Sequence, residues 1–155
     1  MPHFSTTRRV NLTPEQAYAI AADVASYKDF IPLLKRSVIR GERKIENGVD
    51  SFHADLLLMV PKVNMTESFT SQVTADANNH SVTATSSDGP LKSLKAVWKI
   101  SSSTEGKADV SITLDYTLKN MILQMMAGSF MDFAVQKIMQ AFEERGQALY
   151  GSVIS

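Results

Sequence analysis

The sequence contains no cysteine. Without thiols the chain can form no disulfide bond, offer no thiolate nucleophile and build no thiolate metal site. This absence removes one class of catalytic and metal-binding residues, and it is compatible with a reducing compartment.

Net charge is also missing. Sixteen Lys and Arg residues cancel sixteen Asp and Glu residues, so the formal net charge is +0 at pH 7. No overall electrostatic field therefore steers the chain toward nucleic acid, although local charged patches survive this balance.

Long apolar runs are absent as well. The longest apolar segment extends from Met121 to Met131, and polar or small residues interrupt it. No stretch is therefore apolar enough to span a bilayer. Strand-like alternation begins at Phe4, and we expect no signal or transit peptide before it. Any contact with a membrane should be peripheral.

Motifs for catalysis and metal binding are not found. His3, His53 and His80 are the only histidines, and their spacing fits no zinc or metalloprotease pattern. No serine lies in a Gly-x-Ser-x-Gly turn, and no glycine-rich phosphate loop occurs. We therefore expect no catalytic residue, no metal site and no cofactor, and a protein that is not an enzyme.

The chain has the length of one domain of ordinary size, with 155 residues of which 44% are apolar. Alternation over residues 4–10 predicts a first strand, and Thr13-Pro14-Glu15-Gln16 is typical of a helix N-terminus. This helix should run to about Asp23, and a second short helix should end before Pro32. No linker or repeat divides the chain, so we expect a single domain over residues 1–155.

Residues 36–118 show an almost entirely β pattern. Apolar and polar residues alternate with period two, Glu46-Asn47-Gly48 is a hairpin signal, and further turns are expected at 76–79 and 88–90. Such alternation gives one apolar and one wet sheet face, as in an antiparallel meander. The predicted order is one strand, two helices, six strands and a final helix, which is an α+β fold.

The final helix should begin after Asn120, which suits the N-cap position, and end near Gly151, giving a rod of about 45 Å. Its apolar and polar residues fall on opposite faces. The predicted inward stripe comprises Met131, Val135, Ile138, Met139, Phe142 and Leu149. This stripe should cover the apolar face of the sheet.

One long helix laid across a strongly curved sheet need not fill the space beneath it, so this architecture favours a cavity. Inward strand residues should line the cavity, together with residues from the helices. The predicted ligand-binding residues are Phe30, Phe52, Leu56, Glu67, Phe69, Trp98, Ile112, Leu114, Tyr116, Met125 and Phe130. The alternative is that these side chains fill an ordinary core, and the apolar pattern alone favours that alternative.

Glu67 is unusual in this set, because strict alternation places its carboxylate on the apolar face. A buried carboxylate must be protonated, paired or hydrogen-bonded. Glu67 could bond a ligand head group or pair with inward Arg8, or a β-bulge near residues 62–65 could turn it outward. Tyr116 could offer its hydroxyl to a ligand carbonyl, although buried tyrosines usually bond a backbone carbonyl.

A basic segment extends from Lys28 to Lys44, where Asp29 and Glu42 are the only acids. Most such segments are solvated faces. This one adjoins the apolar residues 30–34, which favours an anionic membrane surface as a partner. It is also the best argument for contact with ribosomal RNA.

The start of the final helix is apolar on all sides. Such a helix must bury more than one face, and the sheet can cover only one. We expect the other face to be a membrane gate, with a homodimer interface as the alternative. The predicted gate residues are Leu33, Leu34, Met121, Ile122 and Met126.

Several motifs occur in a characteristic order along the chain. They are Tyr27-Lys28-Asp29-Phe30-Ile31-Pro32, Glu67-Ser68-Phe69-Thr70-Ser71-Gln72-Val73, Gly89-Pro90-Leu91, Leu94-x-x-x-Trp98 and Ala141-Phe142-Glu143-x-Arg145. The ordered set resembles the coenzyme Q-binding START family, which groups a mitochondrial ubiquinone chaperone with bacterial ribosome-association-toxin homologues. The chain departs from the family at Leu33-Leu34, where Trp-Cys is frequent.

The resemblance covers the chain from about His3 to Gly151. It implies a helix-grip fold of the START/Bet v 1 type, in which a curved antiparallel sheet wraps a long C-terminal helix. It also implies that the protein carries ubiquinone, or a similar polyprenyl lipid, for respiratory electron transfer, in the bacterial cytoplasm and peripheral to the inner membrane.

Two rival functions follow from the same resemblance. The first is a protein that binds a ribosomal subunit and blocks subunit association, against which the balanced net charge argues mildly. The second is a polyketide cyclase-type enzyme, against which the lack of a convergent polar cluster on the inward strands argues.

Overall fold

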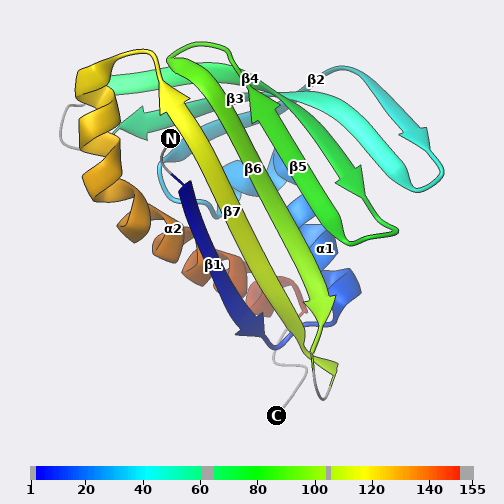
Figure 1. Ribbon diagram of the computed structural model, residues 1–155. Coiled ribbons are helices and arrows are strands. Elements are labelled where there is room, and N and C mark those ends of the chain that lie inside the picture. The colour runs from blue at the N-terminus through cyan, green and yellow to red at the C-terminus, as the bar shows by residue number, and fades with distance from the viewer. Residues whose placement is uncertain (1–2, 61–64, 104–105, 151–155) are drawn as a thin grey trace.

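The computed structural model describes residues 3–60, 65–103 and 106–150 (Figure 1). The elements follow the predicted order of one strand, two helices, six strands and a long helix, and η1 is a 3₁₀ helix. They are β1 (His3–Val10), α1 (Pro14–Ala22), η1 (Val24–Asp29), β2 (Leu34–Glu46), β3 (Val49–Val60), β4 (Met65–Asp76), β5 (Ser81–Ser86), β6 (Leu91–Ser102), β7 (Ala108–Leu118) and α2 (Met121–Tyr150).

The strands form one antiparallel sheet in the order β1-β7-β6-β5-β4-β3-β2. The hairpin between β2 and β3 turns at Asn47 and Gly48, whose φ angles are 52° and 81°. Positive φ at both central residues is the geometry that Asn-Gly favours in a two-residue hairpin. The hairpin signal in the sequence is therefore confirmed.

Side-chain caps begin both α-helices where the sequence predicts them. Thr13 and Gln16 form a capping box, in which each side-chain oxygen accepts a hydrogen bond of 3.1 Å from the other's backbone N–H. Asn120 Oδ1 accepts a hydrogen bond of 2.8 Å from the backbone N–H of Ile122. These caps satisfy N–H groups that have no partner inside a helix.

Both α-helices lie on the same face of the curved sheet, which we call the inner face (Figure 1). On β3, Phe52 and Ala54 are buried on this face, whereas His53 is exposed on the outer face. We call the end of the sheet where β1 ends and β7 begins the lower end. The opposite end, with the start of β4, the end of β7 and the first turn of α2, is the upper end.

The hydrophobic core lies at the lower end, beneath the C-terminal half of α2. Val135, Met139 and Phe142 are buried there, and Phe142 stacks on Trp98 with ring centroids 5.1 Å apart. Gly146 continues this face, because a Cβ at its position would lie only 2.6 Å from Leu12 Cδ1. The absence of a side chain lets α2 approach the core closely.

The turn after β5 holds the upper end of the sheet in place. Gly89 has a φ of 61°, and a Cβ there would lie 2.4 Å from the carbonyl oxygen of Ser68. Asp88 Oδ2 accepts a hydrogen bond of 2.9 Å from the backbone N–H of Thr70. The turn is therefore tied to the start of β4, and it requires glycine.

One sequence expectation for this layer is wrong, and one of the alternatives for Glu67 is not realised. Leu149 is half exposed and does not continue the inward stripe, whose last buried residue in α2 is Gly146. Arg8 pairs with Glu143 of α2, with Nη1 3.7 Å from Oε1, and not with Glu67. Within the described residues, no helix is both long and apolar enough to cross a membrane.

Candidate functional site

The upper half of the inner face carries apolar side chains from five strands. Strand register places Leu56 opposite Phe69, Leu94 opposite Tyr116, and Phe4 opposite Leu114. The Phe4 and Tyr116 rings stack with centroids 6.3 Å apart. We call the following set the upper inner face: Phe4, Leu56, Glu67, Phe69, Ser71, Leu94, Leu114 and Tyr116.

Ser71 and Tyr116 lie at the same level of this face. Ser86 pairs with Leu94, and Leu94 pairs with Tyr116. The register of β4 with β5, which joins Gln72 to Thr85, brings Ser71 level with Ser86. The two hydroxyl-bearing side chains therefore belong to one row that runs across the sheet.

Both hydroxyl groups are buried. Ser71 is 1% exposed and Tyr116 is 2% exposed, and within the described part of the chain neither hydroxyl oxygen has a hydrogen-bond partner. Leaving a buried polar group unpaired costs about 1–3 kcal/mol. Burial also raises the pKa of the Tyr116 phenol, so this group is neutral and can donate a hydrogen bond.

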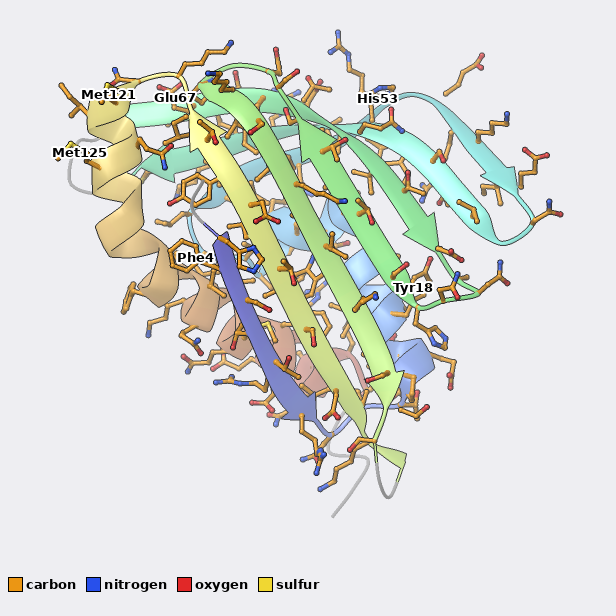
Figure 2. All side chains as sticks on the ribbon, in the orientation of Figure 1. Phe4, Tyr18, His53, Glu67, Met121 and Met125 are labelled. Atoms are coloured by element: carbon orange, nitrogen blue, oxygen red, sulfur yellow. The ribbon has the colours of Figure 1, made fainter. Side chains whose placement is uncertain are left out.

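Glu67 occupies the edge of the same face. Its register with Leu58 belongs to an unbroken ladder from Met65 to Asp76, so Glu67 shares the face of Phe69 and Ser71. Its side chain is partly buried and lies at the upper end of the sheet (Figure 2). The ladder contains no bulge between Met65 and Asp76, whereas residues 61–64 lie outside the described part.

Other predicted ligand-binding residues belong to the core. Phe52, Trp98 and Ile112 are buried in the core cluster, and Leu56 and Leu114 pack against it. Phe30 is partly buried against the same cluster, where its ring lies 5.8 Å from that of Tyr27 and 5.5 Å from Arg145 Cζ. The core interpretation therefore describes the surroundings of Phe52, Trp98, Ile112 and Phe30.

Met125 does not line the inner face. It is 75% exposed, and its side chain points away from the sheet (Figure 2). The preceding residue, Gln124, turns toward the sheet, and its Oε1 accepts a hydrogen bond of 2.7 Å from the backbone N–H of Leu118. Since successive helix residues are about 100° apart, this contact directs Met125 outward. The side chains of Met126 and Phe130 lie outside the described part.

The predicted gate residues divide into two groups. Met121 is 79% exposed and Ile122 is also exposed, so the first turn of α2 presents apolar side chains on the surface. Leu34, in contrast, is buried opposite Leu58 and is not part of this surface. Leu33 is partly buried with a φ of 71°, a strained conformation for a residue other than glycine.

The basic segment is exposed along β2 and the η1 helix before it. Three of its residues have acidic partners: Arg40 with Asp55 at 3.5 Å, Arg43 with Asp50 at 2.7 Å, and Lys44 with Glu46 at 3.7 Å. Lys35 and Arg36 are exposed and form no ion pair with any described residue. These two residues remain as positive charge on the surface.

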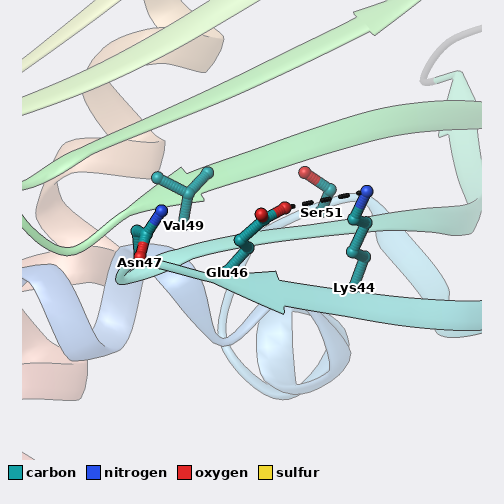
Figure 3. Close-up of a pocket in the computed structure, with 5 residues that line it drawn as sticks. All are labelled: Lys44, Glu46, Asn47, Val49 and Ser51. Carbon is teal, nitrogen blue, oxygen red and sulfur yellow. Dashed lines mark ion pairs between the residues drawn. The ribbon is translucent and has the colours of Figure 1, made fainter.

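Two surface hollows occur away from the upper inner face. One, of about 310 Å³, lies at the β2–β3 hairpin, where Lys44 and Glu46 pair with each other (Figure 3). The other, of about 400 Å³, is lined by polar residues from β3, β4, β5 and the turn after β5, including His53 and Asp88. Neither contains Ser71 or Tyr116. In the described ranges, no group of three or more His, Asp or Glu side chains could hold a metal ion.

Two polar residues of the upper end were not identified as functional from the sequence. Alternation with Phe69 and Val73 puts Ser71 on the inward face, but a serine at this position carries no signal that it is buried or that its hydroxyl lacks a partner among the described residues. Gln124 is one of the polar residues that interrupt the apolar segment from Met121 to Met131, and the sequence indicates no other role for it. Its hydrogen bond to Leu118 depends on the path of the chain between β7 and α2.

Comparison with known proteins agrees with this architecture. A family described as polyketide cyclase / dehydrase and lipid transport matches residues 10–143. The coenzyme Q-binding protein COQ10 homolog B of Xenopus laevis is 31% identical over 153 residues, which is 96% of this chain and 59% of that protein. The chain thus spans little more than half of that mitochondrial relative.

A bacterial relative is covered more fully. The ribosome association toxin RatA of Escherichia coli K12 is 27% identical over 154 residues, which is 98% of this chain and 91% of that protein. Among solved structures, a START superfamily protein from Mycobacterium smegmatis superposes with a TM-score of 0.77 at 18% identity, covering 95% of this chain and 98% of that one. The fold is therefore the START-type helix grip.

Proposed function

The chain belongs to the polyketide cyclase, dehydrase and lipid transport family, and we propose that it is a carrier of ubiquinone or a similar polyprenyl lipid. The observation that carries this proposal is the upper inner face. It combines apolar side chains of five strands with two buried hydroxyls that lack partners among the described residues. An apolar molecule with a few polar atoms has the chemistry to match such a surface.

The mechanism we propose is solvation. Each Å² of apolar surface removed from water contributes about 25 cal/mol, so an isoprenoid tail gains little by leaving a membrane for a protein but much by avoiding water. The carrier then needs only to shield the tail during transfer, and no bond is made or broken.

We propose a carrier rather than an enzyme. The polar groups of the upper inner face are two neutral hydroxyls and the carboxylate of Glu67 at its edge, and His53 lies on the outer face. Ser71 Oγ has no base within hydrogen-bonding distance among the described residues, so nothing there activates it as a nucleophile.

The exposed start of α2 supports peripheral contact with a membrane, and we propose that the protein works at the bacterial inner membrane. Met121, Ile122 and Met125 together expose a surface that is costly in water and favourable at a lipid interface. A second copy of the chain could cover the same surface, and measurement of mass in solution separates the two possibilities.

Lipid extraction tests the proposal directly. The protein should be purified from its own host, extracted with organic solvent and analysed by lipid mass spectrometry. We expect ubiquinone or another polyprenyl lipid in near-stoichiometric amount, and transfer of that lipid between vesicles by the purified protein. A protein that yields no lipid and transfers none would contradict the proposal.

A second candidate function is binding to a ribosomal subunit. It is supported by similarity to the ribosome association toxin RatA over 98% of the chain, and by the exposed Lys35 and Arg36, which form no ion pair with any described residue. Binding through phosphate contacts weakens steeply as salt rises. Stoichiometric cosedimentation with a subunit at low salt, without recovered lipid, would favour this function over the first.

A further inference from the structure

We propose that the lipid enters head group first, and that the head group binds in the row of Ser71 and Tyr116 with the tail directed toward the upper end. This inference rests on the proposed carrier function and specifies how the ligand lies. The head group belongs to a defined chemical class, a ring or chain that carries hydrogen-bond acceptors such as the carbonyl oxygens of a quinone.

The two hydroxyls carry the first step of the argument. They are the buried side-chain groups of the upper inner face that lack partners among the described residues. Both can donate a hydrogen bond, because neither serine nor neutral tyrosine requires a base to do so. Ser71 and Tyr116 lie three strands apart in this row. Acceptor atoms at separate points of a ligand could satisfy them, and a hydrocarbon could satisfy neither.

The direction follows from the packing on either side of this row. Ile112, in register with Trp98, lies four residues below Tyr116 on β7, about 13 Å along the strand. At that level the Trp98 and Phe142 rings are stacked in the core. The route of a long tail therefore runs the other way, past Phe69 toward the exposed first turn of α2.

In this orientation of the ligand, Glu67 would lie beside the tail and not beside the head group. It lies four residues above Ser71 on β4 and is partly exposed, so water can solvate its carboxylate. The head group has no need of this carboxylate when two neutral donors lie deeper on the same face.

Two conservative substitutions test the head-group site. Tyr116→Phe and Ser71→Ala each remove one hydroxyl. The matched control is Tyr18→Phe, which also removes a tyrosine hydroxyl but lies away from the upper inner face, where the Tyr18 ring contacts His80. We expect about fivefold to tenfold weaker binding of decylubiquinone for each of the first two variants. Binding of squalene, which has no head group, should be the same in these two variants as in the wild type. Tyr18→Phe should bind both decylubiquinone and squalene as the wild type does.

The melting temperature of the ligand-free protein provides an independent readout. If the Tyr116 hydroxyl has no partner in the free protein, Tyr116→Phe should leave that temperature unchanged or raise it. A marked decrease would mean that the hydroxyl is a structural hydrogen-bonding group, and it would overturn the proposed role.

The single tryptophan, Trp98, reports the orientation. Quinone rings and bromine atoms both quench indole fluorescence at short range. Decylubiquinone should therefore quench Trp98 more strongly than an analogue with a non-quenching head group and a bromine at the far end of its tail. Stronger quenching by the tail bromine would show that the tail enters first and would overturn the inference.

The remaining outcomes separate the two proposals. Wild-type protein that binds neither decylubiquinone nor squalene would overturn the carrier function and this inference with it. Wild-type protein that binds decylubiquinone, with equal affinity in Tyr116→Phe and Ser71→Ala, would overturn only the head-group site and leave the carrier function intact.

Discussion

The two halves of α2 cover the two ends of the same sheet in different ways. From the midpoint of the helix onward, Val135, Met139 and Phe142 are buried against the lower end. In the N-terminal half, the apolar side chains of Met121, Ile122 and Met125 are exposed. One helix thus contributes a buried apolar stripe to the core and presents a cluster of apolar side chains on the surface at its start.

The sheet shows the same contrast on its inner face. At the lower end Trp98 and Ile112 belong to a close-packed core cluster. At the upper end Phe69 and Tyr116 are buried without belonging to that cluster, and the Tyr116 hydroxyl has no partner among the described residues. The comparison teaches that the packed core and the proposed binding surface lie at different levels of one inner face. We therefore expect that stability and lipid binding can each be changed with limited effect on the other.

The largest expected effect contrasts a phenylalanine at each end. Phe142→Ala should lower the free energy of unfolding by about 3–5 kcal/mol, because it removes a fully buried ring that stacks on Trp98. Phe69→Ala should cost clearly less stability but weaken lipid binding. Urea unfolding and lipid titration measure the two quantities. Equal destabilisation by both variants would show that the upper end is as closely packed as the lower end.

The same substitution at two helix glycines sharpens the comparison at a smaller scale. Gly146→Ala places a Cβ 2.6 Å from Leu12 in the core, and overpacking of about 1–3 kcal/mol should exceed the gain in helix propensity of about 1 kcal/mol. Gly128→Ala, in the N-terminal half, should stabilise α2 by up to about 1 kcal/mol and slow lipid transfer between vesicles.

Thermal unfolding and vesicle transfer check these two glycine variants side by side. Faster transfer by Gly128→Ala, or a destabilisation equal to that of Gly146→Ala, would contradict the predicted role of the start of α2 as a membrane gate, for which a more flexible helix should transfer lipid faster.

The smallest expected effect on stability is at the exposed surface. Ile122→Asp combined with Met125→Asp should change the free energy of unfolding by no more than about 0.5 kcal/mol, because both side chains already face water. It should nevertheless abolish flotation with anionic liposomes. The matched control is Leu149→Asp, because Leu149 is an exposed apolar residue at the other end of α2. This variant should float with anionic liposomes as the wild type does.

Molecular mass in solution identifies the alternative. If the double variant converts a dimer to a monomer while flotation persists, the start of α2 is a subunit interface and not a membrane contact.

Much of the fold could be predicted from local patterns. Period-two alternation located the strands, the Thr13–Gln16 box located the start of α1, and Asn47-Gly48 located the β2–β3 hairpin. The ordered motifs identified the family, which the match over residues 10–143 confirms. These signals are local because each depends on residues within a few positions of one another, or on their order in the chain.

The division of the inner face was decided only by tertiary structure. Alternation shows that Trp98 and Tyr116 share a face. It does not show that Phe142 stacks on Trp98, or that the Tyr116 hydroxyl has no partner among the described residues. The orientation of Met125 depended likewise on the hydrogen bond between Gln124 and Leu118, because a helix that is apolar on all sides has no preferred rotation. Sequence thus determined which elements form and which face of each is apolar. The packing of distant elements determined which apolar residues are enclosed, since burial depends on partners that lie far away in the chain.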